Sequence, residues 1–407
     1  MSLLTRTKAA TTTPSPAASP PPVLWLALLA TPIALSANSP VLILPDMAAA
    51  LNVRTATVTW IVTAFAWAMA VGTPLMANVL RRRGLRTALH TSAAAVVAGT
   101  VLVAFSPWLP LVMGGRAAQA VGGAGLVTVA MSLAGSARRM GVITAGFGVM
   151  GAVGPLLGSL IAETVSWRLS LSVSMLGLLA VPAVLRGANT TTPTTRTPFD
   201  ARGALLLVLT ATALVFLPRY PLAALPAALL GAVLLGLHVR AVPHGFAPLA
   251  VLRSPVFAIS ALLAMALSTS YFTLLFTIPQ LLRDRTDWST PAIGTGQMAA
   301  LLVGSLLSWL LAAASARMNR PRVITILLTV GALAPLTTLL TPWARLLLLA
   351  ASLAVFATTA GNGVLASYAT QATPAPDRPT TIGLFNLAYQ LGGAFGPALA
   401  ALLTLGT

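Results

Sequence analysis

The stretch that decides the fold runs from Arg116 to Ser159 and reads RAAQAVGGAGLVTVAMSLAGSARRMGVITAGFGVMGAVGPLLGS. It consists of two apolar segments joined by a short basic turn, and the first segment contains a lone arginine. The second segment places Gly151, Gly154 and Gly158 on one helix face, where another backbone can approach closely. An arginine inside an apolar helix is costly and marks a cavity or a pairing site. The stretch therefore predicts a polytopic membrane protein with a tightly packed, movable interface.

Composition extends this prediction to the whole chain, which has 407 residues, 57% of them hydrophobic and 7% charged. A soluble domain has too little interior for so many apolar side chains, so lipid must be the solvent. The net charge of +18 does not indicate nucleic-acid binding, because the arginines lie in short turns between apolar runs, where they orient a membrane protein. The chain has no cysteine, no metal-ligand spacing and no phosphate loop or catalytic dyad, so we expect no cofactor, no metal and no enzymatic activity.

The hydropathy pattern predicts an all-α integral membrane protein with about 13 transmembrane helices, the first over 23–45. The expected order is a disordered cytoplasmic tail (1–22), a six-helix bundle (23–186), a cytoplasmic linker (187–203), an extra helix pair (204–241), a second linker (242–255) and a C-terminal bundle (256–407) that ends one helix short. Basic residues concentrate in the turns on one side of this threading, which predicts a cytoplasmic N-terminus.

An internal repeat predicts two pseudo-symmetric bundles. GAVGPLLGSL at 151–160 aligns without gaps with GAFGPALAAL at 393–402. Two related bundles that face each other are the plan of a rocking transporter. The repeated positions are therefore candidates for the interface that governs opening: Gly151, Gly154, Pro155 and Gly158 in the first bundle, and Gly393, Gly396 and Pro397 in the second.

At these residues the chain resembles the major facilitator superfamily, specifically its fourteen-helix drug:proton antiporters. The resemblance is carried by Arg116-Ala-Ala-Gln119, by Gly154-Pro155-Leu-Leu-Gly158-Ser159, by Trp167-Arg168, by Leu44-Pro45, by Trp60 to Phe65 and by Phe199-Asp200-Ala-Arg-Gly203. It implies a monomeric multi-pass protein of the plasma membrane, in this case a bacterial inner membrane. It also implies export of a lipophilic or drug-like small molecule by alternating access, with the lipid bilayer and that molecule as its only partners apart from protons.

Two departures from the family pattern leave proton coupling open. The acid of the loop after helix 2 is replaced by Arg81, and the membrane aspartate of helix 1 would fall at Ser36. The chain has only six acids, and the threading leaves none near the bilayer midplane. Either Asp46 or Glu163, at the outer helix ends, reaches inward and titrates, or the protein is an uncoupled facilitator. An uptake carrier for a metabolite and a degenerate relative that no longer transports also stay open.

The candidate functional residues fall into three further groups. Arg116 and Gln119, with Asp46 and Glu163, are candidates for transport and coupling, although a structural role for Arg116 toward backbone carbonyls or Gln119 is an alternative. The basic cytoplasmic loop motif consists of Arg81, Arg82, Arg83, Gly84 and Arg86. The candidate substrate-cavity residues are polar or aromatic side chains within apolar segments, namely Ser36, Asn38, Trp60, Thr63, Trp67, Tyr271, Asn362, Asn386 and Gln390.

Overall fold

The computed structural model describes residues 21–134, 137–187, 200–242, 245, 246, 248–315, 317–373 and 378–404. All regular structure in these ranges is helical. The expected tail, except for residues 21 and 22, and most of the first linker lie outside the described residues. The all-α membrane fold predicted from the sequence is thereby confirmed for the part of the chain that can be described.

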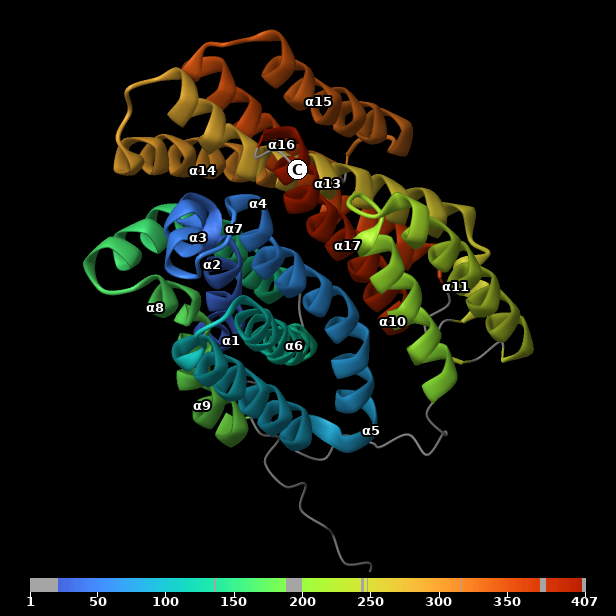
Figure 1. The fold of residues 1–407 in the computed structure, drawn as a ribbon. Helices are drawn as coiled ribbons and strands as arrows, with labels where there is room; N and C mark the ends of the chain where they lie inside the picture. The colour runs from blue at the N-terminus through green and yellow to red at the C-terminus, as the bar shows by residue number, and fades with distance from the viewer. Residues whose placement is uncertain are drawn as a thin grey trace, which may run out of the picture.

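The N-terminal helices gather on one side of the molecule (Figure 1). They are α1 (Val23–Ala30), α2 (Pro32–Asn38), η1 (Ser39–Leu42), α3 (Leu44–Ala50), α4 (Thr55–Val58), α5 (Trp60–Phe105), α6 (Leu109–Ala134), α7 (Ala137–Thr164), α8 (Trp167–Leu171), η2 (Val173–Ala180) and α9 (Val181–Gly187). The first expected segment, 23–45, is therefore broken rather than continuous. Pro32 and Pro40 lie at the breaks, where the missing N–H groups interrupt the helical ladder.

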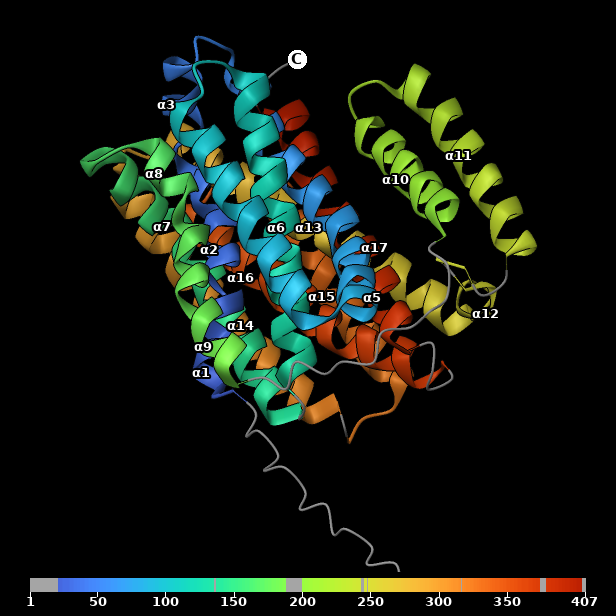
Figure 2. The same ribbon diagram turned by 90° about the horizontal axis from the view of Figure 1, so that it is seen from below.

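The helices of the second bundle lie across from the first (Figure 1). They are α13 (Pro255–Arg285), α14 (Thr290–Ser315), α15 (Arg320–Leu340), α16 (Ala344–Gln371) and α17 (Arg378–Thr404), preceded by the short α12 (Leu249–Leu252). The inserted pair, α10 (Ala201–Phe216) and α11 (Pro221–Ala241), stands at one edge of the molecule, as Figure 2 shows most clearly. Of the two bundles, α5 and α17 are the helices that α10 contacts.

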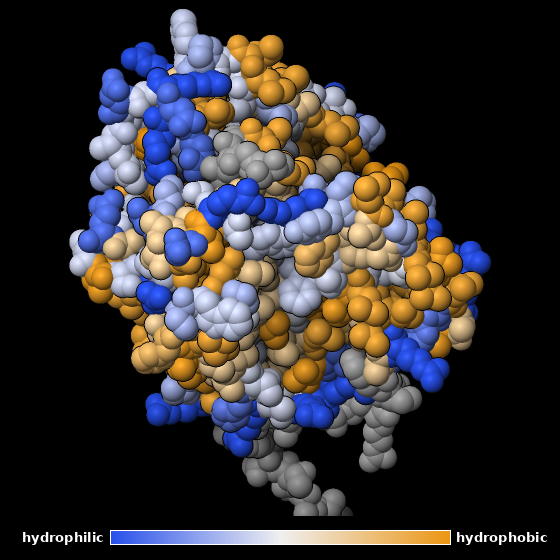
Figure 3. Space-filling model, in the orientation of Figure 1, coloured by the Kyte–Doolittle hydropathy of each residue, from blue (hydrophilic) through white to orange (hydrophobic). Residues whose placement is uncertain are grey.

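Nine stretches of the described residues are long and apolar enough to cross a membrane. The sequence analysis expects about 13 spans, because it divides one of these stretches into two and counts three further segments as spans. Thr55–Phe105 counts once although it holds two arms, while Val173–Gly187 and Ala201–Phe216 are too short for the criterion, and α17 is not among the nine. Apolar side chains predominate on the visible face near α10 and α11 (Figure 3), as expected for a surface in contact with lipid.

The two arms of α5 meet at Gly84, which has φ 79° and ψ 175° and is the only glycine with positive φ among the described residues. Because a side chain is strained at positive φ, glycine is the residue that permits this reversal. A Cβ at Gly84 would meet no atom within 4 Å, so the backbone conformation rather than crowding selects glycine here.

The two bundles repeat one packing plan. In the first, α7 packs on α2 and η1, and in the second, α17 packs on α13. Between the bundles, α5 packs on α17 and α7 packs on α14. Two helix pairs therefore form most of the contact between the halves.

Candidate functional site

Arg116 of α6 is fully buried at the centre of the first bundle. Its Nη1 donates to Ser36 Oγ at 2.9 Å, to Gln119 Oε1 at 2.9 Å and to the Leu171 carbonyl at 3.2 Å. Its Nη2 donates to the Ser36 carbonyl at 2.9 Å, and its guanidinium lies 4.1 Å from the centre of the Phe65 ring. Every one of these partners is neutral, so the charge is stabilised by dipoles and a ring face rather than by a carboxylate.

Ser36 is the residue of this network that bears on proton coupling. The sequence analysis placed the family's membrane aspartate at this position, and the structure places its hydroxyl in direct contact with Arg116. The Ser36 hydroxyl in turn donates to the Leu171 carbonyl at 3.0 Å, and Gln119 Nε2 donates to the Thr100 hydroxyl at 3.0 Å. The network therefore joins α2, α5, α6 and the end of α8 through uncharged groups around one cation.

Prolines explain why buried carbonyls need these donors. A proline has no N–H, so the carbonyl four residues before it loses its helical partner. Pro40 releases the Ser36 carbonyl, which accepts hydrogen bonds from Arg116 at 2.9 Å and from the Ser39 hydroxyl at 3.1 Å. In the same way Pro155 releases the Gly151 carbonyl, to which Asn38 Nδ2 donates at 2.9 Å.

The second bundle contains one such arrangement. Pro279 lies inside α13 and releases the Leu275 carbonyl. Gln297 of α14, which is fully buried, donates to that carbonyl at 2.9 Å. An unpaired buried carbonyl costs about 1–3 kcal/mol, so each of these side chains stabilises a neighbouring segment that contains a proline.

The glycine face of α7 lies inside the first bundle, which differs from the expected contact across the centre. A Cβ at Gly158 would overlap the backbone oxygen of Ser39, and one at Gly154 would lie 2.9 Å from Asn38 Cβ. The contact with the other bundle uses a different face of α7, where a Cβ at Gly294 would lie 3.0 Å from the Leu156 side chain. Helical spacing identified the close-packed face correctly, but it could not say which neighbour fills it.

The matching residues of α17 behave in the same way. A Cβ at Gly396 would overlap Phe272 Cβ of α13, and one at Gly393 would lie 3.3 Å from the Phe272 ring. Pro397 follows directly, as Pro155 follows Gly154. Both repeated motifs therefore pack on the first apolar span of their own bundle, the broken segment Val23–Leu42 in one and α13 in the other, and a gating role for them stays a prediction.

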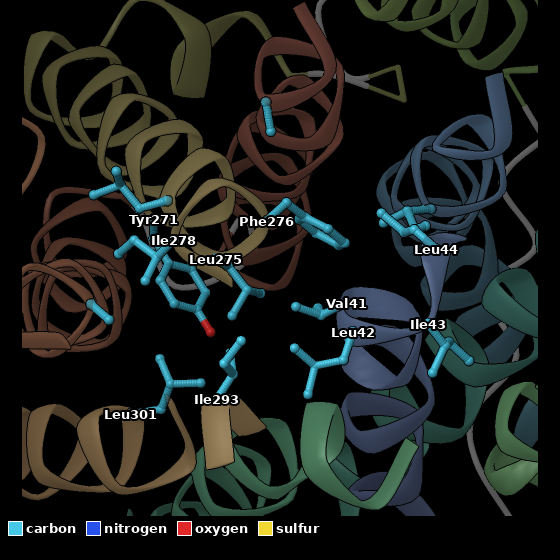
Figure 4. Packing of buried hydrophobic residues seen from close by; sticks show 14 of the residues in the cluster. Val41, Leu42, Ile43, Leu44, Tyr271, Leu275, Phe276, Ile278, Ile293 and Leu301 are labelled. Atoms are coloured by element: carbon cyan, nitrogen blue, oxygen red, sulfur yellow. The ribbon is translucent and has the colours of Figure 1, made fainter. Parts of the chain in front are cut away.

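An apolar seal joins the two bundles at the end of the molecule that carries Asp46, which we call the Asp46 end. Val41 and Leu42 of η1 are 0% and 1% exposed and project toward α13 and α14 (Figure 4). On the other side lie Leu275, Phe276 and Ile293, and all five residues belong to one buried cluster.

Asp46 and Glu163 lie close to this seal but face outward. Both are exposed, and both line a hollow at the Asp46 end together with Ile43, Ala162, Trp167 and Thr290. Neither reaches the Arg116 network through a hydrogen bond or ion pair among the described residues. Their assignment to coupling stays a prediction.

The candidate cavity residues do not form one cluster. Trp67 donates to Thr212 of α10 at 3.0 Å, and the Trp60 ring lies 5.1 Å from the Phe216 ring of the same helix. These two side chains therefore contact the inserted pair, and a place in the substrate cavity stays a prediction for them. Thr63 and Tyr271 are buried, whereas Asn362, Asn386 and Gln390 are half-buried.

The basic loop motif surrounds the Gly84 turn as expected. Arg81, Arg83 and Arg86 are exposed, and Arg82 is half-buried. Asp377, an acid on the same side in the threading, lies outside the described residues. A functional role for this motif stays a prediction.

Sequence reasoning missed a clasp at the base of the inserted pair. Asp200, just before α10, accepts hydrogen bonds from Gly203 N at 2.8 Å and Phe246 N at 2.9 Å, and it pairs with His238 Nε2 at 2.8 Å. Burial works against the charge of Asp200, but the hydrogen bonds from Phe246, Gly203 and His238 hold the pKa of its carboxyl below the usual value. The Asp-Ala-Arg-Gly motif signalled a helix cap, whereas nothing in the sequence spacing indicated the partner 38 residues away.

A family model described as Major Facilitator Superfamily matches residues 24–397. The chain belongs to the major facilitator superfamily. The family is one of multi-pass membrane transporters rather than enzymes, in agreement with the sequence analysis.

Solved structures share the fold of this major facilitator protein. Crystal structures of a bacterial homolog to the human lysosomal transporter Spinster in inward-facing conformation align with a TM-score of 0.61 for the unoccupied form and 0.62 for the occupied form. Each is 16% identical and covers 94% of this chain and 81% of the other. Likeness at this identity shows the fold alone.

Curated relatives match a smaller region. The efflux pump FUS6 of Gibberella moniliformis is 24% identical over 170 residues, which are 38% of this chain and 30% of the relative. The MFS-type efflux pump LUC4 of Fusarium sp. is 25% identical over the same shares, and the MFS-type transporter ppz2 of Metarhizium majus is 29% identical over 38% of this chain and 28% of its own length. The match thus spans less than a third of each relative.

Proposed function

We propose that this major facilitator protein exports a lipophilic or drug-like small molecule by alternating access. The observation that carries the proposal is the apolar seal of Val41 and Leu42 against Phe276, which closes one end between two bundles held together mainly by two helix pairs. Such an interface can open by rocking without unfolding either bundle. The efflux pumps among the relatives support export as the direction.

The proposal includes an orientation. With a cytoplasmic N-terminus in a bacterial plasma membrane, the Asp46 end faces outward and the arginine-rich Gly84 turn faces the cytoplasm, in agreement with the positive-inside rule. The protein then acts as a monomer, because each chain supplies both bundles.

A second candidate, an uncoupled facilitator, is favoured by the Arg116 network. A proton-coupled carrier needs a group that binds a proton in one state and releases it in the other, and a partly buried carboxylate is the common choice. Here Ser36 occupies the position in contact with Arg116, and a serine hydroxyl does not titrate at physiological pH. The arginine keeps its charge, because its guanidinium does not deprotonate in proteins.

Reconstituted protein separates these functions. Proteoliposomes loaded with a lipophilic fluorescent dye should release it faster than protein-free liposomes, and we expect the rate to be independent of an imposed pH gradient. Ser36→Asp would place a carboxylate beside Arg116, and Ser36→Asn is the matched uncharged control. We expect only the aspartate variant to gain dependence on the gradient.

Two results would contradict these proposals. Uphill dye movement driven by the gradient in the unmodified protein, and abolished by Glu163→Gln or Asp46→Asn, would show that one of these acids couples transport to protons. Dye release no faster than in protein-free liposomes, with either gradient, would favour the degenerate, non-transporting relative.

A further inference from the structure

Arg283 makes a contact that the packing of the helices alone does not require. It lies in the last turn of α13, and its Nη2 donates to the Leu42 carbonyl at 3.2 Å. The two residues are 241 positions apart and belong to different bundles. This is therefore a polar link across the interface at the Asp46 end.

The link lies directly beside the apolar seal. Leu42 supplies both the carbonyl that Arg283 binds and a side chain of the seal, and Phe276 lies on α13 two turns before Arg283. Opening this end must separate η1 from α13, because Figure 4 shows the seal filled from these two elements and α14. The Arg283 hydrogen bond must then break in the same movement.

The helix that carries Arg283 is built to bend just before it. Pro279 interrupts the ladder of α13 one turn before Arg283, and the buried Gln297 satisfies the Leu275 carbonyl that this proline releases. The last turns of α13 can thus change direction at Pro279 without leaving that carbonyl unpaired.

A neighbouring arginine provides an internal comparison. Arg285 lies two residues further along the same helix end and donates to the Thr341 carbonyl at 3.1 Å. Thr341 lies between α15 and α16 of the same bundle, so this hydrogen bond does not cross the interface. Both arginines lie in the last turn of α13, near the negative end of its dipole, but of the two only Arg283 binds a residue of the other bundle.

We propose that Arg283 is the latch of the gate at the Asp46 end, a positioning residue that holds the closed state by binding the Leu42 carbonyl. This inference rests on the proposed alternating-access function. Losing a hydrogen bond from a charged donor typically shifts such an equilibrium by about tenfold or more. Removing the guanidinium should therefore raise the population of the open state without changing the fold of either bundle.

Cysteine labelling can test the latch because the chain contains no cysteine of its own. Val41→Cys places a thiol in the seal, where it is buried in the closed state. In full-length protein in lipid nanodiscs, we expect a hydrophilic maleimide to label it about tenfold faster when Arg283→Leu is added. Arg285→Leu, the matched control, should leave the labelling rate unchanged, and Arg283→Lys should fall between.

A second reporter separates gate opening from general loosening. The reporter is Ala130→Cys. Ala130 of α6 is fully buried in a cluster that includes residues of α1 and α9 and lies away from the seal. Its labelling should not respond to Arg283→Leu. Equal labelling of Val41→Cys with and without Arg283, or an equal increase at both reporters, would overturn the proposal. Since labelling does not depend on transport, a failure of the proposed export function would be recognised separately by the dye assay.

Discussion

In the first bundle the glycine face of α7 packs on α2, and the side chain at the point of closest approach is Asn38, whereas in the second bundle the same face of α17 packs on α13 and meets Phe272. Asn38 donates to the carbonyl released by Pro155, and the Phe272 ring has no donor to offer near Pro397. One backbone plan therefore carries a polar connection in one half and an aromatic contact in the other. The difference shows that repeated packing does not require repeated chemistry.

The asymmetry extends beyond this one position. The Arg116 network connects several helices of the first bundle through buried polar groups. In the second bundle, the side chains that donate to buried carbonyls of neighbouring helices include Gln297, which binds the Leu275 carbonyl, and Ser352, which binds the Ala300 carbonyl. The first bundle thus contains the buried charge of Arg116, and the second supplies three of the five named residues of the apolar seal.

The largest expected effect tests the shared packing. Gly154→Leu and Gly396→Leu, at aligned positions of the repeat, should each destabilise the protein by about 1–3 kcal/mol or more, because a Cβ alone would lie 2.9 Å from Asn38 Cβ in one and would overlap Phe272 Cβ in the other. Thermal unfolding in detergent measures this. Gly151→Ala is the control, since its Cβ would lie 3.4 Å from Asn38 Nδ2 and should be tolerated. Wild-type stability in either leucine variant would break the equivalence of the two bundles.

A smaller effect tests the difference between them. Asn38→Leu should cost about 1–3 kcal/mol, because the Gly151 carbonyl loses its donor. In a Pro155→Ala background the helix recovers its own N–H, so the same substitution should cost much less. A double-mutant cycle on thermal stability measures this coupling.

The corresponding cycle in the second bundle is its control. Phe272→Leu should show no coupling to Pro397→Ala, because Phe272 donates no hydrogen bond. Coupling of similar size in both cycles would mean that both halves bind the carbonyl released by the proline in the same way.

The smallest effect is expected outside both bundles, at the Asp200 clasp. Because hydrogen bonds hold the Asp200 pKa low in the folded protein, the stability that it contributes is present above the unfolded value of about 4 and is lost as the pH falls through the folded value. The difference in thermal midpoint between the unmodified protein and Asp200→Ala should be constant from pH 5 to about 8 and shrink below about 4.

His238→Gln serves as the control for this measurement. It keeps a hydrogen-bond donor near Asp200 without an imidazole, so the loss of stability at low pH should persist in that variant. A midpoint difference that grows below about pH 4 would contradict the assignment of a lowered Asp200 pKa.

Local patterns predicted the fold and part of the site. Apolar segment lengths, the Gly-Pro repeat and the Arg116 motif were sufficient for the helical membrane architecture, and the contact of Arg116 with Gln119 follows from their spacing along one helix. The partners of Trp60 and Trp67 were not predictable, because an aromatic side chain in an apolar segment looks the same whether it faces a cavity or another helix. The pairing of Asp200 with His238 depends on tertiary structure in the same way.

Arg116, Asn38 and Gln297 each donate to a carbonyl that a proline deprives of its helical partner, and this affects how related sequences should vary. Each bend is shared between a proline on one helix and a donor on another, so neither residue is constrained alone. Where a homologue lacks the proline that corresponds to Pro155, the selective reason to keep a donor at position 38 disappears. Substitutions at the two sites should therefore covary across an alignment although they are 117 positions apart in the numbering, and position 272 should vary independently of position 397.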